Sequence, residues 1–389
     1  MEPKIRFKGF EGEWRNLSIT EIASLKAGKS FNKLDAIDKP TVGYYPCYGG
    51  NGQRGYLPYY NQEGKYNIIG RQGALCGCIN VAEGKFYATE HAVIVTPINV
   101  SDFEFLHESL IRANINQYAT GAAQPGISVT NVNSQLSLNY PIYEEQKAIG
   151  KYFTSLDSQI SASTSRLASL KQMKAASLQA MFPQEGETVP KIRFKGFEGE
   201  WKKVKLGDIA KFTKGQGYSK SDLKETGQPI ILYGRMYTKY QFVIDEVDTF
   251  ANLKDASILS EGDEIIMPAS GETPEDIACA SAVLVKDIIL GGDLNIMHFD
   301  LTKISTPYIA LVITYSKTHH DLSKCAQGKS VVHLHNGAIS RATISLPSLA
   351  EQQAIASYFT SLDRQISLQS QRLEKLKQIK SACLDKMFV

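Results

Sequence analysis

The sequence lacks a long hydrophobic run, has few cysteines and carries almost balanced charge. No apolar segment reaches the roughly 18 residues that a membrane-spanning helix needs, and we expect no signal peptide. Six Cys at irregular positions in a chain of 389 residues predict free thiols in a reducing cytoplasm. The formal net charge of +3 is too small to indicate a partner, so any basic surface would be local.

Motifs for catalysis and for metal binding are also missing. Gly-Lys-Ser occurs at 28–30 and 328–330, but the Gly that a phosphate loop needs five residues earlier is Ala23 or Ser323. There is no NPPY or DPPY tetrapeptide of a methyl-donor site, and the Glu-x-Lys triplets at 63–65 and 83–85 lack the Pro-Asp of a nuclease core. The group of His319, His320, Cys325, His333 and His335 fits no standard zinc spacing. We therefore expect no catalytic residue, metal or cofactor in this chain.

A long repeated segment dominates the sequence. Residues 144–182 recur at 350–388 with a constant offset of 206 and 23 of 39 positions identical. Both copies lack Pro and are rich in Ala, Leu, Gln, Lys and Ser, which predicts one long helix each. A heptad frame predicts a helix-pair interface made by Ile149, Phe153, Leu156, Ile160, Leu167, Leu170, Ile355, Phe359, Leu362, Ile366, Leu373 and Leu376. The two stripes most simply bury each other; the alternative is that each helix packs on its own domain.

A second repeat divides the chain into two units. The opening motif PKIRFKGFEGEW occupies Pro3 to Trp14 and, letter for letter, Pro190 to Trp201. Each unit is therefore an opening motif, a globular domain and a long helix. The expected boundaries are 1–143 for the first motif and domain, 144–182 for the first helix, 183–189 for a linker, 190–349 for the second motif and domain, and 350–389 for the second helix. We expect the motif to dock onto the helix pair, although its Lys and Arg could instead contact nucleic acid.

The expected fold class is α+β, with two globular mixed α/β domains separated by two long antiparallel coiled-coil-like helices in a pseudo-two-fold internal repeat. In the first domain, residues 20–25 predict a short helix, and 66–69, 74–81, 86–89 and 92–96 predict strands. Ser101 and Glu104 predict a capping box that opens a helix to about Tyr118, and Thr306-Pro307 opens a helix in the second domain. The interiors of the two domains have dissimilar sequences, which indicates a shared frame that holds two different recognition domains.

Polar and aromatic side chains between glycines are candidates for DNA contact. Seven of the 19 Tyr lie between Tyr44 and Tyr66, among Gly, Asn, Gln and Arg. Asn, Gln and Arg pair with adenine and guanine edges, and glycines let a backbone approach a groove. Each such stretch alone is more often a surface loop. The candidate DNA-binding residues are Tyr48, Asn51, Gln53, Arg54, Arg71, Gln72, Gln124, Tyr218, Lys220, Tyr233, Arg235, Tyr237, Lys239, Lys329 and His333.

The whole chain resembles the specificity subunit of type I restriction–modification enzymes. The resemblance rests on EEQ/AEQQ-A-I-x-x-YFTSLD at the start of each long helix, on the GF-x-G-x-W repeat, and on the runs YGGNGQRGY, IIGRQG, ATEHAV, LYGRMYT and ASGETPEDIA. It implies two target recognition domains that each read one half of a split double-stranded DNA sequence. It also implies partners: two modification subunits that bind S-adenosylmethionine and methylate adenine, and restriction subunits that use ATP and Mg for translocation and cleavage.

The length of the helices fits a split site. A 39-residue helix is about 58 Å long, which corresponds to roughly 17 bp of duplex. Two other classes stay open at this point. One is an enzyme with its own active site, and the other is a stand-alone bipartite DNA-binding or scaffold protein without enzyme partners.

Overall fold

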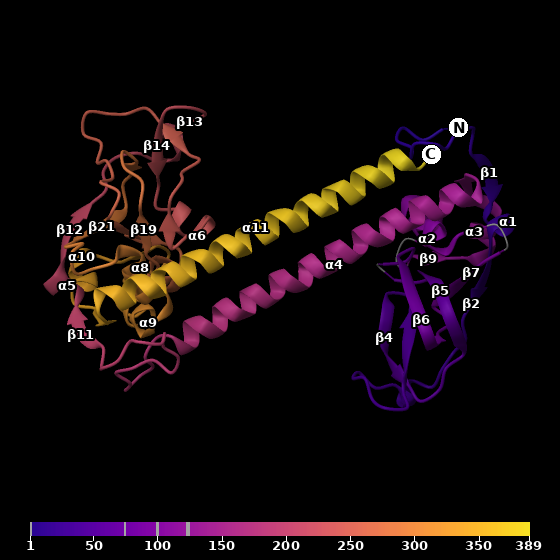
Figure 1. Ribbon diagram of the computed structural model, residues 1–389, viewed down its shortest axis with the longest axis horizontal. Coiled ribbons are helices and arrows are strands. Elements are labelled where there is room, and N and C mark those ends of the chain that lie inside the picture. Colours follow the sequence, from indigo (N-terminus) through magenta and orange to yellow (C-terminus); the bar gives the residue numbers. More distant parts are fainter. Residues whose placement is uncertain (1, 74, 99–100, 122–124) are drawn as a thin grey trace. The chain divides into compact units, whose positions relative to one another are not determined.

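The computed structural model describes residues 2–73, 75–98, 101–121 and 125–389. The chain forms two compact units, the first made of Met1–Ser165 with Gln371–Val389 and the second of Arg166–Ser370. The long helices α4 (Tyr143–Ala180) and α11 (Leu349–Met387) each begin in one unit and end in the other (Figure 1). Each unit therefore contains the start of one long helix and the end of the other.

The first unit is built on a six-stranded sheet. Its strand order is β2-β7-β5-β6-β3-β4, and its neighbours are antiparallel except for the parallel pair β3 and β6. The strands are β2 Ala23–Ala27, β3 Tyr45–Gly49, β4 Gly52–Leu57, β5 Gln62–Gly70, β6 Ile79–Ala88 and β7 Ala92–Pro97. The remaining elements before α4 are β1 Arg15–Ser18, α1 Ile19–Ile22, η1 Lys33–Asp35, α2 Phe103–Arg112, η2 Ile115–Tyr118, β8 Ala119–Thr120, β9 Gly126–Ile127, α3 Val129–Gln135 and β10 Ser137–Tyr140.

The second unit contains a five-stranded sheet of order β12-β21-β17-β19-β15 and a smaller sheet of order β13-β16-β14-β20. The strands of the larger sheet are β12 Ala210–Lys214, β15 Val243–Ile244, β17 Ile265–Pro268, β19 Ser281–Val283 and β21 Leu294–Phe299. The other elements are β11 Lys202–Lys205, α5 Leu206–Ile209, η3 Lys220–Asp222, β13 Leu223–Lys224, β14 Gln228–Ile231, α6 Arg235–Thr238, β16 Phe250–Ala251, β18 Ser270–Gly271, α7 Pro274–Ile277, β20 Ile289–Leu290, α8 Thr306–Tyr315, α9 Lys317–Ser323, β22 Val332–His333, α10 Asn336–Ile339 and β23 Thr343–Leu346.

The two domains share a sheet in spite of their dissimilar sequences. Strands β2-β7-β5-β6-β3 and β12-β21-β17-β19-β15 follow the same order, and in both sheets only the last pair is parallel. The strand pairs β1 with β10 and β11 with β23 also correspond. The dissimilar interior sequences therefore fold into a common backbone arrangement. The two units differ in their side chains and in insertions, such as β4 in the first unit and the small sheet in the second.

Some expected elements of the first domain have different boundaries. The short helix is α1, Ile19–Ile22, because the chain enters strand β2 at Ala23. Of the expected strand at 74–81, residues 75–78 form a turn and residue 74 lies outside the described residues. Residues 79–81 instead belong to the same strand as 86–88, β6, while Ala92–Pro97 confirms the last expected strand. The capping box at Ser101 and Glu104 is wrong: Asp102 caps α2 by accepting from the Phe105 N–H at 3.0 Å. This helix ends at Arg112 because Asn114 adopts a left-handed conformation, with a φ of 47°.

Both copies of the opening motif dock onto the long helices, as expected. In the first unit the guanidinium of Arg6 donates two hydrogen bonds, both of 2.7 Å, to the carboxylate of Glu145 in the first turn of α4. The Ile5 N–H donates to the Lys386 carbonyl at 2.9 Å, and Trp14 contacts Phe388 edge-on. The second copy repeats this arrangement with Arg193 on Glu351, Ile192 on Ala180 and Trp201 on Phe182.

The Arg side chains also hold the shape of the motif. Arg6 donates to the carbonyls of Glu11 and Gly12, and Arg193 donates to those of Glu198 and Gly199. Glycines at these turns have positive φ values, such as 86° at Gly12, which explains why the motif needs Gly there. One Arg therefore fastens the loop to itself and to the helix.

Within each unit the two long helices are antiparallel and meet at a half-buried lysine. In the first unit, Lys380 of α11 lies 2.7 Å from Asp157 of α4. In the second unit, Lys174 of α4 lies 2.6 Å from Asp363 of α11. The two lysines occupy equivalent positions in the repeat, and each interrupts the apolar stripe, so this ion pair fixes the register of the helices.

The apolar stripes pack both on the other helix and on the domains. Ile149 and Phe153 share a core with Met387 and Phe388 in the first unit. Ile355 and Phe359 share a core with Met181 and Phe182 in the second unit. Of the other predicted interface residues, Leu156, Leu170, Leu362 and Leu373 are buried, and Ile160, Leu167, Ile366 and Leu376 are half-buried. The two alternative packings from the sequence thus occur together, because each domain core contains residues of both helices.

We predict that the buried carboxyl of Glu108 makes the first unit lose stability as the pH rises. Glu108 lies 3.1 Å from Lys380 and is 2% exposed, and burial raises its pKa to about 7 although Lys380 acts in the opposite direction. Between pH 4.5, the ordinary pKa of this carboxyl, and pH 7, the folded chain binds more protons than the unfolded chain, so its stability falls. Glu108→Gln cannot ionise. The free energy of unfolding of this variant, taken relative to wild type, should therefore rise by on the order of 3 kcal/mol between pH 4.5 and pH 8.

The measurement is urea unfolding of the full chain across this pH range, followed by Trp14 fluorescence in a Trp201→Phe background. Glu83→Gln, which removes an exposed carboxylate in the same unit, is the matched control and should track wild type. Parallel pH curves for Glu108→Gln and wild type would contradict the assignment.

We also predict that residues 1–186 form a dimer. Residues 165–183 are the repeat of 371–389. In a dimer, Lys174 and Phe182 of a second copy can therefore occupy the places that Lys380 and Phe388 have in the first unit of the full chain. Two antiparallel helices satisfy the two-fold symmetry of such a dimer. Light scattering should give the dimer mass for wild type and for Met173→Asp, whose side chain is exposed, and the monomer mass for Phe182→Asp. A folded wild-type half that stays monomeric at tens of micromolar would contradict the prediction.

Candidate nucleic-acid interface

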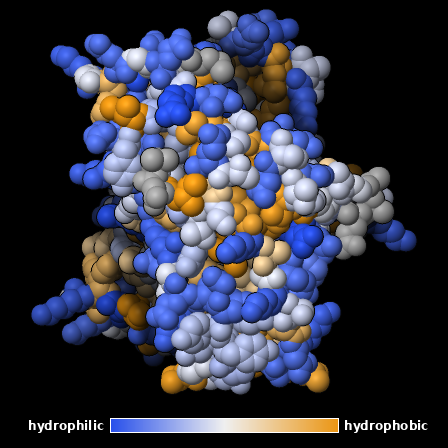
Figure 2. All heavy atoms as spheres, turned by 90° about the vertical axis from the view of Figure 1, so that its right-hand side faces the viewer, coloured by the Kyte–Doolittle hydropathy of each residue, from blue (hydrophilic) through white to orange (hydrophobic). Residues whose placement is uncertain are grey.

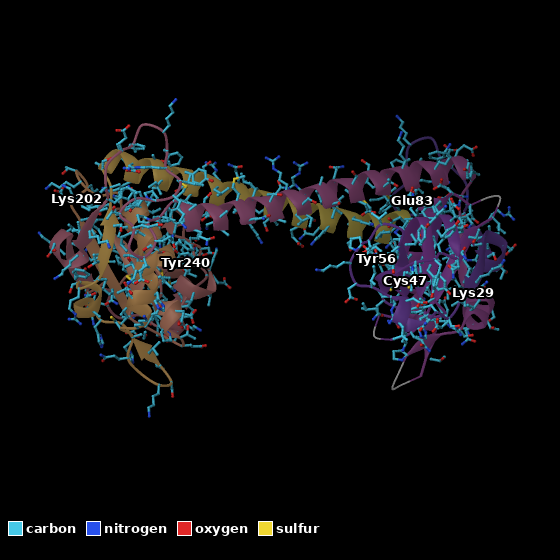
Figure 3. All side chains as sticks on the ribbon, turned by 90° about the horizontal axis from the view of Figure 1, so that it is seen from below. Lys29, Cys47, Tyr56, Glu83, Lys202 and Tyr240 are labelled. Carbon is cyan, nitrogen blue, oxygen red and sulfur yellow. The ribbon has the colours of Figure 1, made fainter. Side chains whose placement is uncertain are left out.

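The ends of several strands of the first unit come together at one edge of its sheet. The Lys29 N–H at the end of β2 donates to the Ala88 carbonyl at 3.0 Å, and the Arg71 N–H after β5 donates to the His91 carbonyl at 2.8 Å. The Thr89 N–H donates to the Tyr48 carbonyl at 2.9 Å. We call Lys29, Asn51, Arg54, Arg71, Gln72, Glu90 and His91 the first strand-end cluster; Figure 3 labels Lys29 within its unit.

Glycines allow the loops of this cluster to lie against each other. A Cβ atom at Gly50 would lie 2.5 Å from the Gln72 carbonyl oxygen, and one at Gly70 would overlap the Gly50 carbonyl. The β3–β4 turn therefore touches the segment after β5 directly. This explains the Gly-rich sequence, because only Gly fits at such a close backbone approach.

The structure brings most candidate residues of the first domain into this cluster. Asn51, Gln53, Arg54 and Gln72 have exposed side chains. Arg54 lies over the Phe31 ring at 5.7 Å. These side chains present amide and guanidinium groups of the kind that pair with base edges. Gln124 lies outside the described residues.

Two candidates in the first domain make internal contacts instead. The half-buried Arg71 donates to the Ile127 carbonyl at 3.1 Å and to the Glu90 carbonyl at 3.4 Å, so it ties three loops together. Tyr48 packs edge-on against Phe86, and burial raises the pKa of its hydroxyl. Arg71 and Tyr48 therefore have a structural role in addition to any contact with a ligand.

Candidates of the second domain are dispersed over several loops. Tyr218 has a φ of 59°, and its hydroxyl accepts from the Lys254 N–H at 3.0 Å, which closes the loop at 252–257. Tyr233 and Tyr237 contact each other edge-on at the start of α6, and burial raises the pKa of Tyr237. Lys220 and Lys329 are exposed.

Arg235 and Lys239 both bind Asp248. The guanidinium of Arg235 lies 2.5 Å from this carboxylate, and Lys239 forms a second ion pair with it. The two cations lower the pKa of Asp248 to about 2. The Arg235 side chain is only 8% exposed, so its charge is used within the domain.

His333 is exposed and stacks on His335 at 6.2 Å. Its strand β22 pairs with β18, opposite Ser270. His333 therefore lies at the edge where β12, β17 and β21 of the large sheet begin or end.

Sequence reasoning missed some residues at these edges. Glu90 and His91 lie between the loops that carry Arg54 and Arg71, and their side chains approach each other at 3.5 Å. The sequence signal for them is the ATEHAV run, which carries three polar residues between two buried strands.

The described residues contain no group of three or more His, Cys, Asp or Glu that could hold a metal ion. None of the described helices combines the length and the apolar character that crossing a membrane requires. On the face shown in Figure 2, hydrophobic side chains lie in several groups between hydrophilic ones.

Two segments match the type I restriction modification DNA specificity domain, residues 11–172 and residues 198–378. Each match includes the largest sheet of one unit, its strand-end edge and most of one long helix. Because the two matches cover most of the sequence, the chain belongs to the family of type I restriction–modification specificity proteins.

Curated relatives carry the same description. The chain is 38% identical to the EcoprrI specificity subunit of Escherichia coli over 154 residues, which are 39% of this chain and 38% of that protein. It is 21% identical to the MjaVIII specificity subunit of Methanocaldococcus jannaschii over 276 residues, 67% of this chain and 64% of that protein. The chain thus matches less than two thirds of the length of either relative.

A solved structure has the same fold. The S subunit of a type I restriction–modification system from M. genitalium superposes with a TM-score of 0.71 at 16% identity, covering 100% of this chain and 99% of that one. The expected fold class, two mixed α/β recognition domains with two long helices, is confirmed.

Proposed function

We propose that this chain is the DNA-binding specificity subunit of a type I restriction–modification complex, in which each recognition domain reads one half of a split DNA site. The observation that carries the proposal is the duplication: two matches to one DNA specificity domain, each containing a sheet of the same strand order and each preceded by an opening motif whose Arg docks onto a long helix. Different exposed side chains at the two strand-end edges support two different half-sites.

Partner subunits would carry out methylation, translocation and cleavage. Two modification subunits would bind S-adenosylmethionine and methylate adenine, and restriction subunits would use ATP and Mg for translocation and cleavage. The chain itself would act as a non-catalytic part that selects the sequence. The six thiols are free, which supports a reducing cytoplasm as the location.

A stand-alone bipartite DNA-binding or scaffold protein is the alternative function. Genes for a methyltransferase and a helicase-nuclease beside this gene would exclude it. Mapping methylated adenines across the host genome would give both half-sites and the length of the spacer between them.

We predict that the isolated chain neither methylates nor cleaves DNA. The measurement combines highly purified chain with DNA, S-adenosylmethionine, ATP and Mg, and repeats the reaction after adding modification subunits as a positive control. Methylation should appear only with the modification subunits. Methylation or cleavage of DNA by the chain alone would contradict the assignment of catalysis to partner subunits.

We predict that Arg54→Ala weakens recognition of one half-site and leaves the other unchanged. Its exposed guanidinium can pair with a guanine edge, and such a contact is worth about 1–3 kcal/mol of discrimination. Arg71→Ala should show the same effect and also lower stability, because it removes the hydrogen bonds to Ile127 and Glu90.

Binding of the assembled complex to duplexes altered in one half-site at a time measures this discrimination. Arg15→Ala, which removes an exposed Arg of the same unit, is the matched control for lost charge. If Arg54→Ala and Arg71→Ala both keep wild-type affinity and preference, these side chains do not contact the bases.

A further inference from the structure

The strand-end edges of the two units share one hydrogen-bonded backbone frame. In the first unit, the Gly28 N–H donates to the Ala92 carbonyl at 2.9 Å. In the second unit, the Gly215 N–H donates to the Leu294 carbonyl, also at 2.9 Å. A Cβ atom at either glycine would overlap the carbonyls just before β7 or β21, so both glycines are required by the same close approach.

Further hydrogen bonds repeat around these glycines. The Arg71 N–H donates to His91 at 2.8 Å, and the Ala269 N–H donates to Asp293 at 2.7 Å. The carbonyls of Arg71 and Ala269 in turn accept from the N–H groups of Ile127 and Leu334. The Lys29 N–H donates to Ala88 at 3.0 Å, and the Gln216 N–H donates to Leu290 at 3.2 Å.

This frame gives a residue-by-residue correspondence that sequence comparison does not give. The bridge between Gln72 and Gly126 matches the register pair of Ser270 and His333. The corresponding pairs are Lys29 with Gln216, Arg71 with Ala269, Gln72 with Ser270, Glu90 with Gly292, His91 with Asp293, and Gly126 with His333.

None of these pairs has the same side chain, although the opening motif is identical in both units and the long helices share 23 of 39 residues. The backbone of the edge is thus kept while its polar groups differ. Such a pattern is what two domains need in order to present different hydrogen-bonding groups to two different sequences from the same position.

We propose that His91 and Asp293 are equivalent base-reading residues, with Asp293 accepting a hydrogen bond from a cytosine amino group in the second half-site. This inference rests on the proposed function. His91 directly precedes β7 and Asp293 directly precedes β21, and Asp293 is exposed.

The backbone at Asp293 is built to present its carboxylate. Its φ of 57° is left-handed, a conformation that few residues other than Gly, Asn and Asp adopt readily. The Ser270 hydroxyl donates to the carboxylate at 3.1 Å and so fixes its orientation. A carboxylate near DNA is repelled by the phosphates, which weakens binding. A hydrogen bond that the carboxylate accepts from the amino group of cytosine offsets this repulsion, and only the correct base provides it.

The test uses the full chain assembled with its modification subunits and a library of randomised DNA duplexes. Sequencing of the methylated duplexes gives the preferred base at every position. The variants are Asp293→Asn and His91→Asn. Asn suits the left-handed backbone of Asp293, and the side chain of His91 is only half-buried, so both variants should fold. Asp255→Asn, which removes an exposed carboxylate of the second unit, is the matched control.

We expect Asp293→Asn to change the preference at one position of the second half-site by about tenfold, with the first half-site unchanged. His91→Asn should change one position of the first half-site only, and Asp255→Asn should change neither. Unchanged preferences in folded Asp293→Asn and His91→Asn complexes would overturn the inference. A wild-type complex that selects no split sequence would instead overturn the proposed function.

Discussion

The junction of opening motif, long helix and domain core in each unit depends on one carboxylate that is buried away from water. Glu145 and Glu351 stand in the first turns of the long helices and are 0% and 1% exposed. A buried charge is tolerated only with a partner, and removing the partner of such a pair typically costs about 3–5 kcal/mol. Arg6 and Arg193 supply the partners through paired hydrogen bonds. The opening motif, the helix start and the domain core are therefore joined at one point in each unit.

Repeated elements could be predicted from the sequence because the same side chains recur in them. The long helices, the opening motif and its docking follow from residues such as Phe7, Trp14 and Leu156 that keep their identity or spacing. Local boundaries were harder. Asp102 rather than Ser101 caps α2, and the left-handed Asn114 ends this helix before the expected residue. A single residue decides each of these features, so a pattern over many residues does not reveal them.

The shared sheet could not be predicted in this way. It is held by backbone N–H and carbonyl groups, which every sequence provides, so the dissimilar side chains of the two domains conceal it. The candidate site shows the same limit. Asn51, Arg54 and Gln72 lie in the first strand-end cluster, but the contact of Arg235 and Lys239 with Asp248 depends on how the following loop folds back, which their sequence pattern does not show.

The shared cores also determine the order in which the chain can fold during synthesis. The second unit is one continuous segment, but the core of the first includes Met387 and Phe388. At about 5–20 residues per second, the ribosome needs roughly 10–40 s to make the 206 residues between Phe182 and Phe388. During this interval the first core lacks its last aromatic residue, and Phe182, which has the same place in the repeat, is already synthesised. A newly made first unit is therefore a natural target for a chaperone, or for the helix of a neighbouring nascent chain.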